Sequence, residues 1–424
     1  MTETLGPPQA APDDASASTS ANASATASAA WHRILRKVGL VYIYSRLCVL
    51  AGAAIVAVEL QADINQVKGL ANVPFADPHI AGRPLPTSAL GPMSDVLASW
   101  DGIWYLRIVR QGYPRHVQEH VTYFVADARA AFFPAYPLLV RFVDKVLPGG
   151  DTLAALSINF VLGAIAIYLL GVIARRLYGP QIAAKAMVLG AMFPGSFVLS
   201  FAYTEALLLV FAMGCLWCLM SKRWVAAGVL AALGTATRPN GLALVLACAV
   251  ASLLAIRKER EWKSLIAPLL SPAGFIAFQL WLDHHTGEVG VWFRVQSEAW
   301  GEGASYGLTA IRKTVEAFSS PLTSSTNVIT AASVMAMLLM IYFAWVRRLP
   351  PPLVAYSAGI IALMLLPNTV TARPRFLYTA FPLFISAAAF LHNDRRDWWP
   401  YVIGACSVGL VTLTALYGVF GAIP

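Results

Sequence analysis

The run IAAKAMVLGAMFPGSFVLSFAYTEALLLVFAMGCLWCLMS, residues 182–221, decides the class of this fold. It contains one lysine and one glutamate, and about 20 mostly apolar residues suffice for a helix to cross a bilayer. Pro194-Gly195 and the turn at 201–205 interrupt the run, because proline and glycine disfavour a continuous helix. The run therefore predicts two membrane spans, at 182–199 and 203–221.

The composition of the whole chain also places it in a membrane. Of its 424 residues, 58% are hydrophobic and 12% are charged, whereas about a quarter of the residues of a soluble domain carry a charge. The net charge of +9 does not indicate a nucleic-acid partner, because many basic residues lie at the ends of apolar segments. We predict an all-α polytopic membrane protein of about eleven spans. These are 38–60, 152–174, 182–199, 203–221, 224–237, 239–256, 264–282, 327–346, 351–367, 375–391 and 399–421.

The basic connectors between these spans predict their orientation. If segment 131–147 does not cross, the short connectors rich in arginine and lysine all lie on the cytoplasmic side with the N-terminus, as the positive-inside rule requires. If it crosses, they all lie outside. The segment contains two prolines and three charged residues, so we interpret it as an interfacial or re-entrant helix. The protein is then a multi-pass plasma-membrane protein whose polar turns face the extracytoplasmic side.

The chain divides into a tail and one domain. Residues 1–30 are rich in alanine, serine, threonine and proline, and we expect them to form a disordered cytoplasmic tail. Residues 31–424 are expected to form a single transmembrane domain. Its outer loop, 61–151, is expected to carry interfacial helices with aromatic residues at headgroup level.

That loop contains an acid among aromatic residues, in Ser-Trp-Asp-Gly-Ile-Trp-Tyr-Leu, residues 99–106. Loops positioned by a rigid scaffold often carry functional residues. Asp101 could be the N-cap of an amphipathic helix that ends near Gly112. Alternatively, it could be a catalytic base, with or without a capping role. We favour the base because other polar turns are predicted on the same face.

Those turns carry an acid and three arginines. Glu205 begins a predicted span, where it could serve the helix dipole, orient a sugar hydroxyl or assist a base. Arg238, Arg373 and Arg375 flank prolines in turns, and arginine binds phosphate bidentately. The alternative for these arginines is snorkelling to lipid headgroups. Candidate substrate-binding residues are Trp100, Trp104, Tyr105, Tyr203, Asn240 and Gln296.

Metal and nucleotide sites have little support in the sequence. His116 and His120 flank Glu119, but the order is not that of a zinc-binding His-Glu-x-x-His motif, and no third ligand is obvious. The chain has no Walker loop. We therefore predict no metal site and no cofactor, with a divalent cation left open.

The chain resembles the PIG-V family, the enzymes that add the second mannose in GPI-anchor assembly, and in particular its bacterial relatives. The residues that carry the resemblance lie in order between about 95 and 385. They are Trp100-Asp101-Gly102 with Gly112-Tyr113, Phe132-Phe133-Pro134 with Tyr136-Pro137, Ser200-Phe201-Ala202-Tyr203-Thr204-Glu205, Ala236-Thr237-Arg238-Pro239-Asn240-Gly241 and, more loosely, 296–301 and 373–382. One departure is Pro239, where many relatives have serine.

The resemblance implies a GT-C-type glycosyltransferase that uses a polyprenyl-phosphate sugar, usually mannose, on the outer face. It assigns the family's two functional acids to Asp101 and Glu205. We expect an inverting mannosyltransferase that acts on an extracytoplasmic glycolipid or glycan, with membrane lipids and no nucleic acid as partners. The alternatives are a transporter or flippase for a lipid-linked sugar and a non-catalytic scaffold in envelope assembly. The acceptor does not follow from the resemblance.

Overall fold

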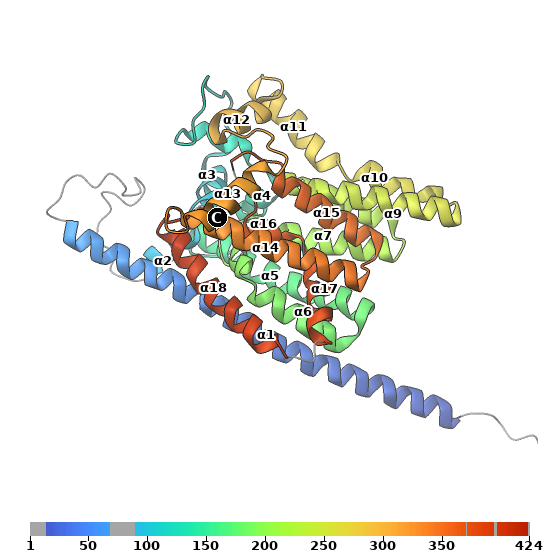
Figure 1. The fold of residues 1–424 in the computed structure, drawn as a ribbon. Helices are drawn as coiled ribbons and strands as arrows, with labels where there is room; N and C mark the ends of the chain where they lie inside the picture. The colour runs from blue at the N-terminus through green and yellow to red at the C-terminus, as the bar shows by residue number, and fades with distance from the viewer. Residues whose placement is uncertain (1–13, 68–89, 370, 394–396, 423–424) are drawn as a thin grey trace, which may run out of the picture.

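The helices of the computed structural model follow the apolar segments of the sequence (Figure 1). The structure describes residues 14–67, 90–369, 371–393 and 397–422. Within these ranges the chain forms α-helices and short 3-10 helices and no β-strand. The predicted all-α class is therefore confirmed.

Six helical segments are long and apolar enough to cross a membrane. Four of them are Ser28–Val58 within α1 (Asp14–Val67), α5 (Gly150–Tyr178), α14 (Ser325–Arg347) and α18 (Trp399–Gly418). The fifth, Pro239–Glu259, consists of η3 (Pro239–Leu242) and α9 (Ala243–Glu259). The sixth, Trp262–Thr286, contains η4 (Trp262–Leu265), α10 (Ile266–Leu270) and α11 (Ala273–Thr286). Shorter apolar helices are α7 (Glu205–Met220), α8 (Trp224–Thr235), α15 (Pro351–Leu365) and α17 (Pro382–His392). All of them coincide with predicted spans. The number of segments that cross stays a prediction.

The predicted span 182–199 is divided in the structure. Helix α6 (Pro180–Met192) ends before Pro194, and η2 (Pro194–Leu199) continues as a 3-10 helix. Proline has no backbone N–H and its ring clashes with the preceding turn, which explains the break.

The N-terminal segment differs from the expected disordered tail. Helix α1 begins at Asp14, inside the segment 1–30, while residues 1–13 lie outside the described residues. The segment is rich in alanine, and alanine has the highest intrinsic helix propensity.

Segment 131–147 forms a helix too short to cross a bilayer. Helix α4 (Ala135–Asp144) has 10 residues and a length of about 15 Å, half of the hydrocarbon thickness of about 30 Å. Leu138 and Phe142 are exposed, and Tyr136 and Val140 are buried, so α4 is amphipathic. This favours the interpretation that the segment does not cross. Its position at the interface stays a prediction.

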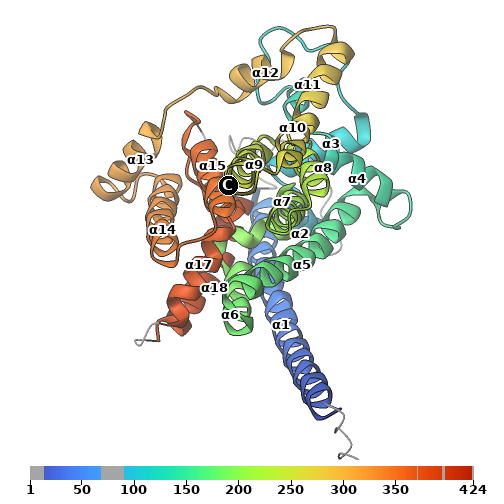
Figure 2. The same ribbon diagram turned by 90° about the vertical axis from the view of Figure 1, so that its right-hand side faces the viewer.

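Short helices pack against one end of the bundle of long helices (Figures 1 and 2). They are α2 (Leu90–Leu97), α3 (Asp101–Gln111), η1 (Ala126–Ala131), α4, α12 (Val291–Trp300), α13 (Leu308–Ser319) and α16 (Pro374–Thr379). A large apolar cluster fills the bundle, and a second joins α3, η1, α4 and α12 to the start of α5. The second cluster lies at the end that carries Asp101.

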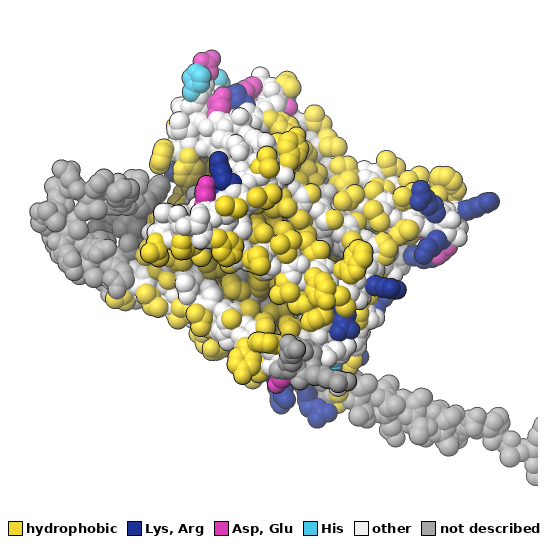
Figure 3. All heavy atoms as spheres, viewed as in Figure 1, with side chains coloured by type: hydrophobic (Ala, Val, Ile, Leu, Met, Phe, Trp, Pro, Cys, Tyr) yellow, Lys and Arg dark blue, Asp and Glu magenta, His cyan; other side chains and the backbone are white. Residues whose placement is uncertain are grey.

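Charged side chains are unevenly distributed over the surface. Figure 3 shows lysine and arginine gathered where α9 meets α10 and along the lower edge, whereas acidic residues and histidines gather over the end near α12. This is the kind of asymmetry that the positive-inside rule predicts. The orientation of the chain in a membrane stays a prediction.

Candidate active site

A cavity of about 440 Å³ lies where the short helices meet the bundle. Its walls come from α3, the segment before α4, η3, α12 and the loop after it, the end of α15, and α16. Of the predicted site residues, those that line it are Asp101, Tyr105, Arg238, Asn240, Gln296 and Arg375. Those placed elsewhere are Trp100, Trp104, Tyr203, Glu205 and Arg373. The structure therefore brings together one of the two predicted acids and two of the three arginines.

Asp101 and Arg375 form an ion pair in the wall of this cavity. Arg375 Nη1 donates to Asp101 Oδ2 at 2.6 Å. The Asp101 side chain is 24% exposed and that of Arg375 is 8% exposed. The N-cap position of α3 belongs to Trp100, and Asp101 is the first helical residue. The interpretation of Asp101 as an N-cap is therefore wrong, and its carboxylate is available to the cavity.

Trp100 holds the start of α3 in an unusual conformation. Its φ of 56° lies in the left-handed region, which a tryptophan rarely adopts. The indole Nε1 donates to Tyr417 O at 2.8 Å, and the ring lies 5.0 Å from that of Phe420. These contacts anchor α3 to the end of α18. Trp100 thus orients Asp101 and does not reach the cavity, contrary to the substrate-binding role expected of it.

Glu205 and Arg238 form a second ion pair behind the cavity. Glu205 is the first residue of α7, and its carboxylate contacts Arg238 Nη1. The same nitrogen lies 3.4 Å from Thr204 Oγ1. The Glu205 side chain is 1% exposed, whereas Arg238 lines the cavity. This placement favours a positioning role for Glu205 over direct contact with a substrate.

Two close backbone contacts place the turns that carry these arginines. A Cβ atom on Gly241 would lie 2.3 Å from Gly234 O, which only glycine avoids, so η3 can pack against the end of α8. A Cβ atom on Gly195 would lie 2.2 Å from Pro374 O, so α16 can pack against η2. The interruptions seen in the sequence therefore set the positions of Arg238 and Arg375.

Arg373 does not line the cavity. It is fully buried, and its Nη1 donates to Thr330 Oγ1 at 2.7 Å and to Thr326 O at 3.2 Å. It therefore ties α16 to α14. Of the two arginines that flank Pro374, only Arg375 could contact a ligand in this cavity, so the placement does not favour a phosphate-binding role for Arg373 there.

Aromatic side chains form one side of the cavity. Tyr105, Phe132 and Trp300 line it. Trp104 lies behind them, with ring centroids 6.0 Å from Phe132 and 6.1 Å from Trp300. Tyr203 is fully buried, with the Arg375 guanidinium 5.5 Å from its ring centroid. Trp104 and Tyr203 therefore support the site from behind, which differs from their expected role in substrate binding.

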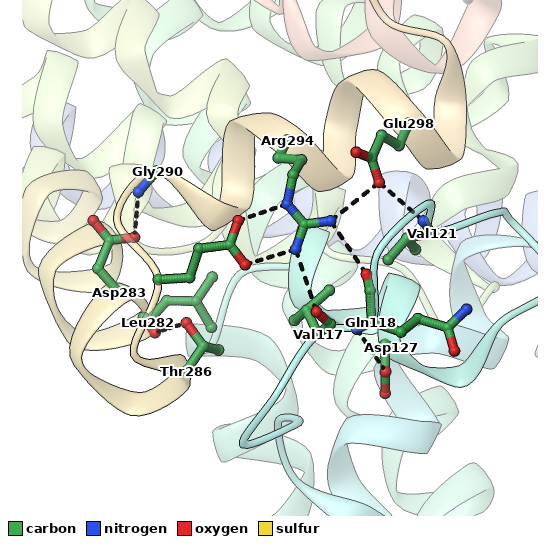
Figure 4. A network of polar contacts seen from close by, with 11 residues as sticks. Val117, Gln118, Val121, Asp127, Leu282, Asp283, Thr286, Gly290, Arg294 and Glu298 are labelled. Carbon is green, nitrogen blue, oxygen red and sulfur yellow. Dashed lines mark hydrogen bonds and ion pairs between the residues drawn. The ribbon is translucent and has the colours of Figure 1, made fainter.

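Arg294 holds helix α12 against the loop after α3 (Figure 4). Its guanidinium donates to both carboxylate oxygens of Glu288, at 2.5 and 2.6 Å, and to Glu298 Oε2 at 3.1 Å. It also donates to the backbone oxygens of Val117 and Gln118 in the loop after α3. The bond from Arg294 lowers the pKa of the Glu288 carboxyl below its ordinary value. This network positions Gln296, whose Nε2 donates to Ala131 O at 3.4 Å.

Glu302 also lines the cavity, although it was not predicted as a site residue. It follows α12 and lines the same cavity as Asp101. Burial raises the pKa of its carboxyl above the ordinary value, against the opposing effects of Thr369, Asn368 and the Lys313 charge. Its sequence context, an acid between Gly301 and Gly303 and two residues after Trp300, is similar to that of Asp101 and could have identified it.

The described part of the chain contains no group of three or more His, Cys, Asp or Glu side chains that could hold a metal ion. The predicted absence of a metal site and of a cofactor stays a prediction.

Comparison with known proteins supports the resemblance found in the sequence. Residues 87–282 match the family model described as Mannosyltransferase (PIG-V). This part of the chain is similar to the PIG-V family. The PIG-V match includes Asp101, Glu205 and Arg238, whereas Glu302 and Arg375 lie beyond it. The comparison with curated proteins finds no match.

Solved structures that are similar to parts of this chain include proteins from Cupriavidus metallidurans and Archaeoglobus fulgidus. ArnT from Cupriavidus metallidurans in the apo state is 14% identical, with a TM-score of 0.48 over 73% of this chain and 56% of its own. The oligosaccharyltransferase from Archaeoglobus fulgidus, in complex with Zn and sulfate, is 14% identical, with a TM-score of 0.43 over 76% of this chain and 48% of its own. The chain thus spans about half the length of these proteins.

Proposed function

We propose that this protein is an inverting glycosyltransferase that moves a mannosyl residue from a polyprenyl-phosphate donor to an extracytoplasmic glycolipid or glycan. The observation that carries the proposal is the Asp101 carboxylate, held by Arg375 in a cavity with aromatic walls and a second arginine, Arg238. The PIG-V match, which contains Asp101, supports a mannosyl group as the transferred sugar.

Asp101 has the chemistry of a general base. Its Oδ2 accepts a hydrogen bond from Arg375, which leaves the second carboxylate oxygen to accept the proton of an acceptor hydroxyl. The deprotonated hydroxyl oxygen then attacks the anomeric carbon as the bond from that carbon to the phosphate oxygen breaks. Attack from the face opposite the phosphate inverts the anomeric configuration.

Arg375 and Arg238 suit the leaving group. Negative charge develops on the polyprenyl phosphate as the glycosidic bond breaks, and guanidinium groups in a buried site stabilise such charge. Both side chains are mostly buried and line the cavity. The Glu205 carboxylate keeps Arg238 in place from behind. The prenyl chain would lie among the apolar helices, because apolar groups are more stable away from water.

The test is a transfer assay with the purified full-length protein, radiolabelled polyprenyl-phosphate mannose and candidate envelope lipids. Asp101→Asn is expected to reduce transfer by about 10²–10⁴-fold, because the amide cannot accept the proton. The matched control is Asp151→Asn, which removes the acid of another arginine pair, at 2.5 Å from the exposed Arg110. It is expected to retain activity. Full transfer by Asp101→Asn would overturn the catalytic assignment. Movement of the donor across vesicle membranes without any transfer would instead indicate a transporter.

A further inference from the structure

Glu302 has a buried carboxylate oxygen that lacks a hydrogen-bond partner. Its Oε2 is inaccessible to solvent and unpaired in the structure, although the residue lines the cavity. An ionised carboxylate is only a hydrogen-bond acceptor, and leaving one unsatisfied away from water costs about 1–3 kcal/mol or more. A ligand that supplies a hydrogen-bond donor would therefore relieve this cost.

The backbone around Glu302 is fixed against the end of α15. Ser305 N donates to Leu366 O at 2.8 Å, and Ser305 Oγ donates to Pro367 O at 2.9 Å. Ala304 forms an isolated antiparallel bridge with Pro367. Thr369 and Asn368 lie near the Glu302 carboxyl and act to lower its pKa. The backbone that carries Glu302 is thus held in place before any ligand binds.

The charges in the cavity indicate what kind of group Glu302 would receive. Arg238 and Arg375 provide the positive charge that a phosphate needs, whereas Glu302 would repel a phosphate. Neutral hydroxyl groups are the donors that suit a carboxylate. Trp300, two residues before Glu302, lines the same cavity, and a flat ring together with a few polar groups is a common arrangement for orienting a ligand.

We propose that Glu302 is a specificity-determining residue that accepts hydrogen bonds from hydroxyl groups of the transferred hexose. The inference rests on the proposed function and deepens it, because it assigns the sugar to one residue and the phosphate to the arginines. Asp101 then retains the role of base, and Glu302 takes no part in proton transfer.

The test is equilibrium binding without an acceptor, so that no transfer occurs. The ligands are polyprenyl-phosphate mannose, its monodeoxy analogues at C2, C3, C4 and C6, and polyprenyl phosphate without sugar. We expect the wild-type protein to bind at least one deoxy analogue about 10–100-fold more weakly than the full donor, as for loss of a hydrogen bond to a charged group. In Glu302→Gln that difference should shrink to about threefold or less, because a neutral amide forms weaker hydrogen bonds with hydroxyls. Affinity for bare polyprenyl phosphate should not change.

The matched control is Glu316→Gln, a partly exposed acid on α13 next to Arg312, which should bind every ligand like the wild type. If Glu302→Gln keeps the full discrimination between donor and analogues, the inference is overturned. A thermal-unfolding measurement and the unchanged affinity for bare polyprenyl phosphate exclude a folding defect as the cause of lost discrimination. The wild type could discriminate between the donor and its deoxy analogues and yet transfer no sugar when acceptors are added. That result would overturn the proposed function but not the sugar-binding role of Glu302. Absence of donor binding would overturn both.

Discussion

The two carboxylate–arginine pairs at the cavity, Asp101–Arg375 and Glu205–Arg238, are similar in sequence and different in environment. Asp101 and Glu205 each begin a helix after an aromatic turn, and Arg238 and Arg375 each adjoin a proline. The Asp101 side chain is 24% exposed and lines the cavity with its arginine. Glu205 is 1% exposed, and only its arginine reaches the cavity.

This difference in exposure indicates which acid can react with a substrate and which acid can only position its arginine. A base must touch the group that it deprotonates, which Asp101 can do and Glu205 cannot do from its buried position. A buried carboxylate without access to a ligand can still neutralise and orient an arginine that has such access. The same residue types therefore supply a reacting group in one pair and a positioning group in the other.

The largest stability effect is expected at the buried pair. Glu205→Gln would leave the Arg238 guanidinium buried without its counter-charge, which typically costs about 3–5 kcal/mol. Thermal unfolding of the purified protein in detergent should show a marked loss of stability, while Asp101→Asn should lose less, because the Asp101 side chain is 24% exposed and that of Glu205 is 1% exposed. Equal destabilisation by the two variants would contradict the comparison.

The next effect concerns phosphate binding. Arg375→Lys keeps the positive charge but loses the planar fork that contacts carboxylate or phosphate oxygens. We expect kcat/KM for the donor to fall by about 10–100-fold, equivalent to about 1.4–2.7 kcal/mol. Arg110→Lys, in the exposed pair with Asp151, serves as the control and should retain activity. An unchanged kcat/KM in Arg375→Lys would assign the phosphate to another residue.

The smallest effect is a pH dependence of sugar recognition. Burial raises the pKa of Glu302, so its carboxylate becomes protonated at a higher pH than an ordinary glutamate. Below that pKa the neutral acid accepts weaker hydrogen bonds, and the preference for the sugar-bearing donor over bare polyprenyl phosphate should fall by up to about tenfold. Above it the preference should reach a plateau. Binding titrations from acidic to neutral pH check this, and Glu302→Gln should abolish the dependence.

Much of the architecture could be predicted from local sequence. Apolar segments predicted the helices, because burial in lipid requires runs of apolar residues. The Pro194-Gly195 break and the start of α7 at Glu205 also followed from residue types. The start of α1 at Asp14 lies inside the segment predicted as a tail, where low hydrophobicity and the high helix propensity of alanine favour different structures.

The site could be predicted only in part. Asp101 and Arg375 were identified as candidates, but their pairing joins α3 to α16, far apart in the chain. Trp104 and Tyr203 were expected to contact substrate, yet both pack behind the cavity. Aromatic residues at a membrane surface serve packing and binding equally well, so residue type alone does not separate these roles.

The sequence by itself determined that this is a helical membrane protein with an acid in an aromatic loop and motifs similar to those of the PIG-V family. These features depend on composition, periodicity and short-range order. Only the tertiary structure decided that Arg375 lines the cavity while Arg373, two residues earlier, does not, and that Glu302 does. The direction in which a turn residue points depends on what packs against the turn. Here that includes the contact of Gly195 with Pro374, which no local pattern encodes.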